Sequence, residues 1–390
     1  MAQIELENIT KRYGDKTALD HISLCVRDNE FFVLFGPAGA GKTTLLKTIA
    51  GIEFPQEGLV KINGKTVNQV EPMNRNVSMV FENYALYPQL SVYDNIAFPM
   101  RSRLYKKDEA YIKSAVDRVT KMLNISNLLD RRPVQLSNGQ RQRVAIGRCL
   151  VREPNVFLMD EPLAHLDAKL RHFMREELKE MQSSFNTTTI YVTHDYMEAM
   201  SLADRIAVLN NGKFEQTGTA HEMYYEPANE FVAKLFGEPE INLFPAEPYE
   251  EDGVLKLRAF SKDTSLIPRG DVSAALRENG GKTVDVGVRG ADIDFSFENR
   301  GDGWVRGSVY ACEPIGNKVI VTVTVAETQV RVVAPNSTRA ELDSDIYLRF
   351  HTEDLLYFDE MTKELIGRSG GNRPAEKTKR TEGVVEAWHS

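Results

Sequence analysis

The stretch "FFVLFGPAGAGKTTLLKTIAG" (31–51) joins an apolar run to a glycine-rich loop and then to a helical pattern. The pattern G-x-x-x-x-G-K-[ST] between a strand and a helix is typical of a phosphate-binding loop. Its glycines let backbone N–H groups turn towards phosphate oxygens, and the helix N-terminus adds its positive end. We expect Lys42 to reach the β- and γ-phosphates of a bound nucleotide and Thr43 to place its hydroxyl on Mg²⁺. The predicted loop comprises Gly36, Pro37, Ala38, Gly39, Ala40, Gly41, Lys42, Thr43 and Thr44.

A second stretch, "VFLMDEPLAHLD" (156–167), reads as a buried strand that ends in two acids. Asp160 at the strand end could hold Mg²⁺ through water, and Glu161 would point differently and polarise the attacking water. Two acids at a strand end are equally typical of a solvated edge when they stand alone. The phosphate loop upstream makes the catalytic interpretation the stronger one.

Short apolar runs alternate with helical patterns through the first part of the chain. Runs at 31–35, 76–81, 155–160 and 187–193 are apolar on both faces, which is typical of a mostly parallel sheet covered by helices. The segment 205–218 instead predicts a hairpin, with Asn-Asn-Gly at its turn. Between 105 and 150 the pattern is helical. The sequence therefore predicts an α/β fold with a helical insertion.

The character of the sequence changes where Pro, Gly and acids cluster at 236–253. Beyond this point "NKVIVTVTV" (317–325) alternates with period two, so that every second valine faces one side. We predict a first domain over 1–236 and a small all-β barrel or sandwich over 237–368. The polar, Gly-rich stretch 369–390 predicts a flexible tail.

The whole chain has 390 residues and a formal net charge of −8. This length predicts two domains, and the charge gives no basic field for nucleic acid. No run of 18 apolar residues and no secretory signal is present in the sequence. Cys25, Cys149 and Cys312 are odd in number and far apart, which predicts reduced, partly buried thiols of a cytoplasmic protein.

One further segment, "LSNGQRQRVAIGRCL" (136–150), precedes the acidic strand. The order of phosphate loop, LS-x-GQ, LMDEP, LD and "YVTHD" (191–195) resembles the ATPase subunit of ABC transporters, and more narrowly the MalK-like ATPases of carbohydrate importers. The resemblance runs from about residue 3 to 366 and includes "GVRGADI" near the start of the C-terminal motif. It implies a RecA-like domain with a helical subdomain at about 88–150 and an antiparallel β edge, followed by an OB/TOBE-like barrel.

The resemblance also implies roles for single residues. Tyr13 stands where an aromatic ring stacks on the adenine, although an exposed Tyr without a role is a simple alternative. His194 stands at the switch position near the γ-phosphate, although a lone His is more often structural. Asp167 matches a loop that contacts the second subunit. The signature that would meet the γ-phosphate held by the opposite subunit comprises Ser137, Asn138, Gly139 and Gln140.

Three positions depart from the family's pattern. Glu82 stands in place of Gln, Asn138 in place of Gly, and Ala164 in place of Ser. The family's Gln meets both Mg²⁺ and the attacking water. A carboxylate binds a hard cation more strongly but repels the γ-phosphate, and while ionised it donates no hydrogen bond. A protonated Glu82 would resemble Gln, so the sequence leaves the sign of the effect open.

The function that the resemblance implies is ATP hydrolysis that drives solute import by a membrane complex. The subunit would sit at the cytoplasmic face of the inner membrane, pair with an identical or paralogous ATPase, and serve an extracytoplasmic solute-binding protein indirectly. A groove for a helix of the transmembrane subunit would be lined by Tyr84, Leu86, Tyr87 and Pro88, unless these residues only pack between subdomains.

Two other classes of function stay open at this level. A weakly hydrolysing, mainly ATP-binding partner in a heterodimer is suggested by Glu82 and Asn138. A soluble ABC ATPase of the translation-factor or chromosome type would need tandem cassettes or a long coiled coil, and the sequence shows neither pattern. The identity of the solute is not encoded in this chain's motifs.

Overall fold

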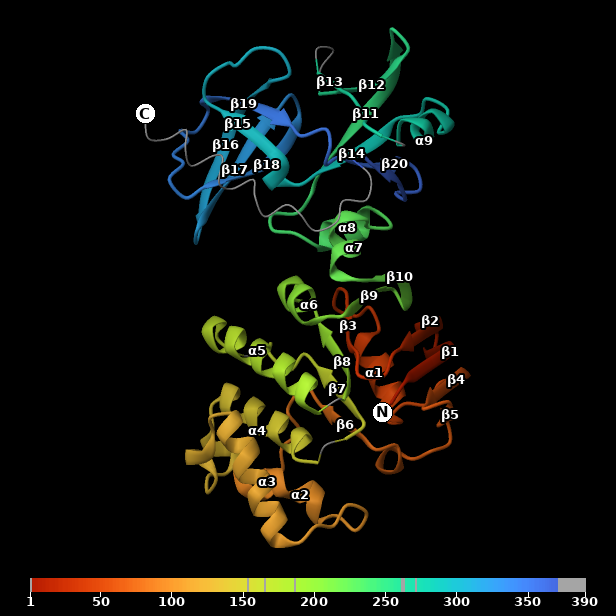
Figure 1. Cartoon of the computed structure of the whole chain (residues 1–390), viewed down its shortest axis with the longest axis vertical. Coiled ribbons are helices and arrows are strands. Elements are labelled where there is room, and N and C mark those ends of the chain that lie inside the picture. The colour runs from red at the N-terminus through yellow and green to blue at the C-terminus, as the bar shows by residue number, and fades with distance from the viewer. Residues whose placement is uncertain are drawn as a thin grey trace. The chain divides into compact units, whose positions relative to one another are not determined.

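The computed structural model describes residues 2–152, 154–164, 166–185, 187–260, 264–270 and 272–370. The chain divides into two compact units, Met1–Met223 and Tyr224–Ser390. Figure 1 labels the elements of both units.

The core sheet of the first unit has the strand order β10-β9-β3-β8-β7-β6. All its neighbours pair in parallel except the hairpin of β9 and β10, as the sequence predicts. The strands are β3 (Phe31–Phe35), β6 (Val77–Val80), β7 (Val156–Asp160), β8 (Thr188–Thr193), β9 (Arg205–Asn210) and β10 (Lys213–Gly218). Strands β3, β7 and β8 are buried along their whole length.

The prediction of full burial was wrong for β6. Val77, Ser78 and Met79 are only half-buried, and Val80 alone is buried. Strand β6 is the edge of the sheet, and among the described residues β7 is the one strand that pairs with it. A run of apolar residues does not by itself distinguish an edge strand from a central one.

One face of the core sheet carries α1 (Lys42–Ala50) and a separate antiparallel sheet of order β2-β1-β4-β5. A single apolar cluster joins α1 to both sheets, so the helix lies between them. The other face carries α5 (Ala168–Phe185) and α6 (Tyr196–Leu202), as Figure 1 shows. The antiparallel strands are β1 (Ile4–Tyr13), β2 (Lys16–Val26), β4 (Glu57–Ile62) and β5 (Lys65–Thr66).

Helices occupy most of the segment between β6 and β7. α2 (Val92–Arg101), α3 (Glu109–Met122) and α4 (Asn138–Leu150) pack against one another at the β6 side of the unit (Figure 1). Ser91, Asp108 and Ser137 cap their N-termini by accepting backbone N–H bonds. Short 3₁₀ turns connect them at Ser126–Leu128 and Pro133–Gln135, and another precedes β6 at Pro72–Asn74.

The second unit contains two antiparallel sheets around one apolar core. Its sheet orders are β13-β12-β11-β14-β20-β21 and β15-β19-β16-β17-β18. The strands are β11 (Asn242–Glu251), β12 (Val254–Ala259), β13 (Ser265–Leu266), β14 (Val284–Val288), β15 (Ile293–Ser296), β16 (Val305–Ile315), β17 (Lys318–Val325), β18 (Thr328–Pro335), β19 (Asp345–Phe350), β20 (Leu356–Asp359) and β21 (Leu365–Arg368).

Strand β17 confirms the predicted alternation, because Val319, Val321, Val323 and Val325 are all buried in this core. The unit also contains helices that a purely all-β prediction omits: α8 (Glu230–Leu235), α9 (Val272–Glu278) and the 3₁₀ turn Gly290–Asp292. Helix α7 (Ala220–Tyr225) spans the point where the chain passes from one unit to the next.

The structural division falls before the boundary at 236 that the composition suggests. Arg289, which is 5% exposed, donates hydrogen bonds to the carbonyls of Tyr224, Ala233 and Phe236. These bonds attach 224–236 to the second unit, since the guanidinium offers several donors to carbonyls that a helix end leaves free. The composition could not reveal this contact because Arg289 is distant in sequence.

The tail was predicted to begin at residue 369, but this residue packs inside the second unit. Ser369 is fully buried, lies 3.0 Å from the Tyr357 hydroxyl and accepts a hydrogen bond from the Arg269 N–H. Residues 371–390, which make up the rest of the predicted tail, lie outside the described residues.

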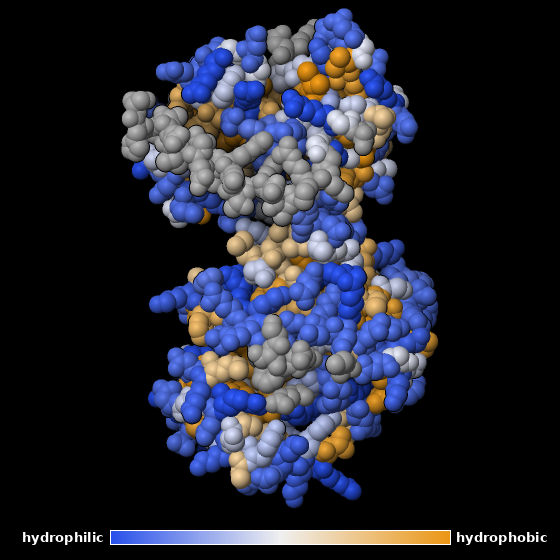
Figure 2. Space-filling model, in the orientation of Figure 1, coloured by the Kyte–Doolittle hydropathy of each residue, from blue (hydrophilic) through white to orange (hydrophobic). Residues whose placement is uncertain are grey.

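The three cysteines are free thiols, as predicted, but their burial differs. Cys149 is buried and Cys312 half-buried, whereas Cys25 is exposed. Among the described residues no helix is long and apolar enough to cross a membrane. On the face drawn in Figure 2, hydrophilic residues dominate the first unit and apolar ones form small separate patches.

Candidate functional site

The phosphate loop is shaped by glycines that no larger residue could replace. Gly36 and Gly41 have φ values of 150° and 111°, in the region that favours glycine. A Cβ at Gly36 would lie 2.1 Å from the Leu209 carbonyl oxygen, and one at Gly41 would lie 2.5 Å from the Ala18 carbonyl oxygen. The loop therefore packs its backbone directly on neighbouring strands, which leaves its other side free to face a ligand.

Lys42 starts helix α1 and its ammonium lies inside the loop. Nζ donates hydrogen bonds to the carbonyls of Gly36 at 2.7 Å and Pro37 at 2.9 Å. Burial lowers the pKa of Lys42, while the charges of Glu161 and Asp160 oppose that effect. The buried Lys42 ammonium can bind a phosphate, and the nearby carboxylates of Asp160 and Glu161 suit a phosphate that brings a metal cation with it.

Thr43 and Asp160 meet although 117 residues separate them in sequence. The Thr43 hydroxyl donates to Asp160 Oδ1 at 3.0 Å, because α1 begins and β7 ends at the same edge of the core sheet. Burial raises the pKa of Asp160 to about 6, the Thr43 bond opposes this, and the charges of Glu82 and Glu161 add to it. An excess of oxygen donors and negative charge at one point fits Mg²⁺, which prefers hard oxygen ligands.

Glu161 and His194 form the third part of the site. His194 Nδ1 lies 3.0 Å from Glu161 Oε2, and the imidazole is 61% exposed against 22% for the carboxylate. Glu161 has φ of 47°, and its N–H donates to the Val192 carbonyl at 3.1 Å. A positive φ is uncommon for a residue with a side chain, so the chain turns sharply directly after β7.

Glu82 and Tyr13 lie at the margin of this arrangement. Glu82 is exposed in the turn after β6, and its charge is close enough to contribute to the raised pKa of Asp160. Tyr13 is 45% exposed, and Lys11 Nζ lies 5.0 Å from the centre of its ring. Burial raises the pKa of the Tyr13 hydroxyl, and its hydrogen bond to the side chain of Thr44 opposes that shift. The ring thus borders the phosphate loop.

The signature residues surround the start of helix α4. The Ser137 hydroxyl accepts from the Gln140 N–H at 3.3 Å, and Gln140 Oε1 accepts from the Ser137 N–H at 3.0 Å. This capping box fixes the loop and leaves the positive helix end exposed. Asn138 accepts from Arg141, and Gly139 packs near Leu166. The described residues alone do not bring this segment to the phosphate loop of the same chain.

Asp167 lies at the start of α5 and is exposed. Its carboxylate accepts from the Leu170 N–H at 2.9 Å, and its carbonyl accepts from the Arg171 N–H at 2.8 Å. In the described residues Asp167 is therefore a helix cap, and no bond from it to the phosphate loop is present. Contact with a second subunit stays a prediction for this residue.

The segment 84–88, which is predicted to contact a transmembrane partner, is fixed by hydrogen bonds to its backbone. Arg148 donates to the carbonyls of Tyr84 at 3.0 Å and Ala85 at 2.7 Å. Buried Asn95 accepts from the Tyr87 N–H and donates to its carbonyl. Tyr84, Leu86 and Tyr87 are half-buried and Pro88 is exposed. The backbone is thus satisfied by α2 and α4, while apolar side chains remain accessible.

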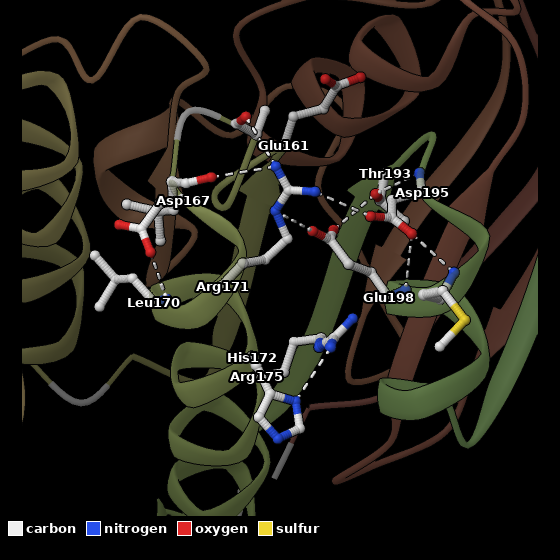
Figure 3. Close-up of polar contacts among 12 residues, drawn as sticks. Glu161, Asp167, Leu170, Arg171, His172, Arg175, Thr193, Asp195 and Glu198 are labelled. Carbon is white, nitrogen blue, oxygen red and sulfur yellow. Dashed lines mark hydrogen bonds and ion pairs between the residues drawn. The ribbon is translucent and has the colours of Figure 1, made fainter. Parts of the chain in front are cut away.

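Sequence reasoning missed a polar network behind His194. Arg171, Asp195 and Glu198 come from α5 and from the start of α6, and Figure 3 shows their charged groups pointing towards one another. The spacing Asp195-x-x-Glu198 after a buried strand is a helix-start signature that could have drawn attention to two of them. Nothing in the sequence pointed to Arg171.

The fold and the site together define a P-loop ATPase. Residues 19–164 match the family model described as ABC transporter, and 286–358 match the model of the TOBE domain. A solved dimeric bacterial ABC transporter cassette is similar with a TM-score of 0.53 and 30% identity, covering 56% of this chain and 98% of that chain. A related dimer bound to ADP and Pi gives a TM-score of 0.52 at 29% identity, over 56% and 98% of the two chains.

Curated relatives narrow the class. The trehalose/maltose import ATP-binding protein MalK of Thermococcus litoralis is 42% identical, over 94% of this chain and 100% of its own length. The xylose/arabinose import ATP-binding protein XacK of Haloferax volcanii is 40% identical, over 94% and 96%. The sn-glycerol-3-phosphate import ATP-binding protein UgpC of Rhodopseudomonas palustris is 51% identical, over 64% and 68%. The chain therefore belongs to the ABC transporter family as a MalK-like ATP-binding subunit, an ATPase coupled to transport.

Proposed function

We propose that this ATPase powers the import of a carbohydrate or a related small polar solute. Relatives named for trehalose/maltose, xylose/arabinose and sn-glycerol-3-phosphate import support this solute class. The observation that carries the chemistry is the meeting of Thr43 and Asp160 at 3.0 Å, beside buried Lys42. It joins the phosphate loop to the acidic strand end at one point.

In this proposal Lys42 and the backbone of the phosphate loop bind the β- and γ-phosphates, and Tyr13 stacks on the adenine. Thr43 and Asp160 hold Mg²⁺, with Glu82 near the same position. Bound Mg²⁺ would neutralise charge on the phosphates during transfer. Glu161 accepts a proton from the attacking water, and His194, 3.0 Å away, orients that carboxylate and faces the γ-phosphate.

The proposal also requires a second ATPase subunit. Ser137 to Gln140 sit at an exposed helix N-terminus, where an anion is favourable, but they are not joined to the phosphate loop of their own chain. We assign them to the γ-phosphate of the opposite subunit, with Asp167 at the same contact. The dimeric cassettes among the similar solved structures support this arrangement.

The membrane partner would be a transmembrane subunit that inserts a short helix beside Tyr84, Leu86, Tyr87 and Pro88. The Tyr87 and Phe98 ring centres lie 4.6 Å apart, and Phe98 is 45% exposed, so an apolar surface continues onto α2. A helix-in-groove contact uses such a surface. In this proposal the protein would sit at the cytoplasmic face of the cell membrane and serve an external solute-binding protein indirectly.

Glu161→Gln tests the proposal. The variant keeps the size of the side chain but cannot accept a proton, so ATP should stay bound while turnover falls by about 10²- to 10⁴-fold. Loss of hydrolysis should also trap a closed dimer, which sedimentation in the presence of ATP and Mg²⁺ detects. The matched control is Glu176→Gln on α5, where an exposed carboxylate pairs only with His172 at 3.5 Å. Hydrolysis at the parent rate in Glu161→Gln would place the base elsewhere.

A further inference from the structure

Arg171 lies between two loops that the proposed mechanism uses separately. From α5 its Nη2 donates to the carbonyls of Ala164 at 3.4 Å and Leu166 at 3.2 Å, in the loop that follows Glu161. Its Nη1 donates to Asp195 Oδ2 at 3.2 Å, next to His194. Figure 3 shows the guanidinium placed between Glu161 and Asp167 on one side and Thr193, Asp195 and Glu198 on the other.

The Asp195 side of this contact is rigidly built. Asp195 Oδ1 accepts from the Met197 N–H at 2.8 Å, and the Asp195 N–H donates to the Thr193 hydroxyl at 3.0 Å. His194 is the residue between these two anchored positions. Its backbone is therefore held from both sides, whereas its imidazole is 61% exposed and reaches only Glu161 among the described residues.

Glu198 continues the network into the core. Its side chain is 3% exposed, and Oε2 accepts hydrogen bonds from the hydroxyls of Tyr191 and Thr193, each at 2.8 Å. Arg171 Nε lies 3.9 Å from Glu198 Oε1. Arg171 thus lies within ion-pair distance of two acids, Asp195 and the buried Glu198.

The loops meet around one small cavity. Its volume is about 50 Å³. The lining residues are Glu161, Ala164, Arg171, Thr193, His194, Asp195 and Glu198. Glu161, His194 and Arg171 therefore line the same cavity. A shift of either loop would move the side chains that line it.

We propose that Arg171 is a positioning residue that couples Ala164 and Leu166, near the proposed subunit contact at Asp167, to the position of His194 beside Glu161. Only a planar fork with several fixed donors can hold two carbonyls and a carboxylate of different loops at once. A change at the subunit contact is then transmitted through Arg171 and Asp195 to His194. The inference rests on the proposed roles of His194 and Asp167.

The test is Arg171→Met in the full chain, with Arg175→Met as the matched control. Arg175 is one turn further along α5, and its side chain contacts the exposed His172 at 3.3 Å. In the part of the chain that the structure describes, Arg171 makes no hydrogen bond to the phosphate loop. Arg171→Met should therefore lower kcat by at least about tenfold and leave KM for ATP within about twofold. Arg175→Met should change neither. A change in KM with an unchanged kcat would overturn the proposal.

Two further variants keep the test decisive. In a His194→Ala background, single-turnover rates should fall no further when Arg171→Met is added, since a positioning residue acts through the histidine. A full additional loss there would show a merely structural role. Asp195→Asn removes the charge but keeps the cap, so it should match Arg171→Met and add nothing to it. It carries the test if Arg171→Met does not fold. His194→Ala at the parent rate would instead contradict the proposed function.

Discussion

The phosphate loop and the acidic side of the site are built in different ways. The loop is nine consecutive residues, 36–44, and its shape comes from glycine backbone that touches the carbonyls of Ala18 and Leu209. The acidic side instead collects side chains from the ends of β7 and β8, the turn after β6, and helices α5 and α6. The phosphate loop is thus one continuous segment, whereas the core sheet brings the acidic residues together from distant parts of the chain.

This difference affects how each region tolerates change. A backbone site depends on few side chains, so Lys42 carries most of the charge that faces a phosphate. A site built from side chains depends on several interacting groups. The pKa of Asp160, for example, is affected by Thr43, Glu82 and Glu161. A single substitution in the phosphate loop should therefore abolish most of the ATP binding. Substitutions on the acidic side should have smaller effects on turnover, and these effects should not be additive.

Lys42→Ala should have the largest effect. The change removes the full positive charge whose ammonium lies within the loop, 2.7 Å from the Gly36 carbonyl oxygen. Loss of one such charge at an effective dielectric near 20 corresponds to an ATP affinity lower by about a hundredfold or more. Titration calorimetry with ATP and Mg²⁺ measures it, and Lys47→Ala on the same helix is the control. Retained micromolar ATP affinity in Lys42→Ala would show that the phosphate loop does not depend on this one side chain.

Glu82→Gln should have a smaller effect of opposite sign. An ionised Glu82 adds negative charge near the γ-phosphate, a repulsion on the order of a few kcal/mol that attraction to Mg²⁺ partly offsets. Turnover should therefore rise by about several-fold to a hundredfold. The measurement is a pH–rate profile at saturating Mg²⁺ with the membrane partner present. Equal or lower turnover at every pH would contradict the repulsion.

Asp160→Asn should stabilise the protein without nucleotide or metal. Folding raises the pKa of Asp160 from its ordinary 3.8 to about 6, so the ionised form is disfavoured in the folded state. The folded protein then binds more protons between these two values, and its stability falls as pH rises through them. Replacement by neutral Asn should add up to about 3 kcal/mol above pH ~6 and nothing below pH ~4.

Urea unfolding in EDTA at several pH values measures this stability. Asp204→Asn, a partly exposed acid paired with Lys179 at 2.9 Å, is the control and should not show the same pH window. A gain in Asp160→Asn that is equal at all pH values would show that the raised pKa of Asp160 is not its cause.

Removal of the second unit should have the smallest effect on nucleotide binding. A chain shortened to residues 1–240 keeps every residue assigned here to ATP, so its ATP affinity should change by no more than about twofold, with weaker dimerisation. Without Arg289 the carbonyls of Tyr224, Ala233 and Phe236 lose their donors, and proteolysis should cut 224–236 first. A folded 1–223 chain is the matched control, and loss of ATP binding in both would show that the two regions described above are not sufficient.

The sequence by itself determined the α/β fold, the parallel core strands, the hairpin at 205–218 and the phosphate loop. These features depend on short-range patterns: two-sided apolar runs, turn residues, and glycines at fixed spacing before a lysine. The sequence also placed Asp160 at the end of a buried strand, because the apolar run stops there. The roles of Tyr13, Ser137, Asp167 and His194 came from the order of motifs and remain predictions.

Tertiary structure alone decided which strand became the edge, where the units divide and what holds His194. Strand β6 is half-buried because only one neighbour pairs with it, and 224–236 belongs to the second unit because Arg289 binds its carbonyls. Arg171 meets Ala164 and Asp195 only because α5 lies beside α6 on one face of the sheet. Such contacts depend on the pairing of distant segments, which a local pattern does not encode.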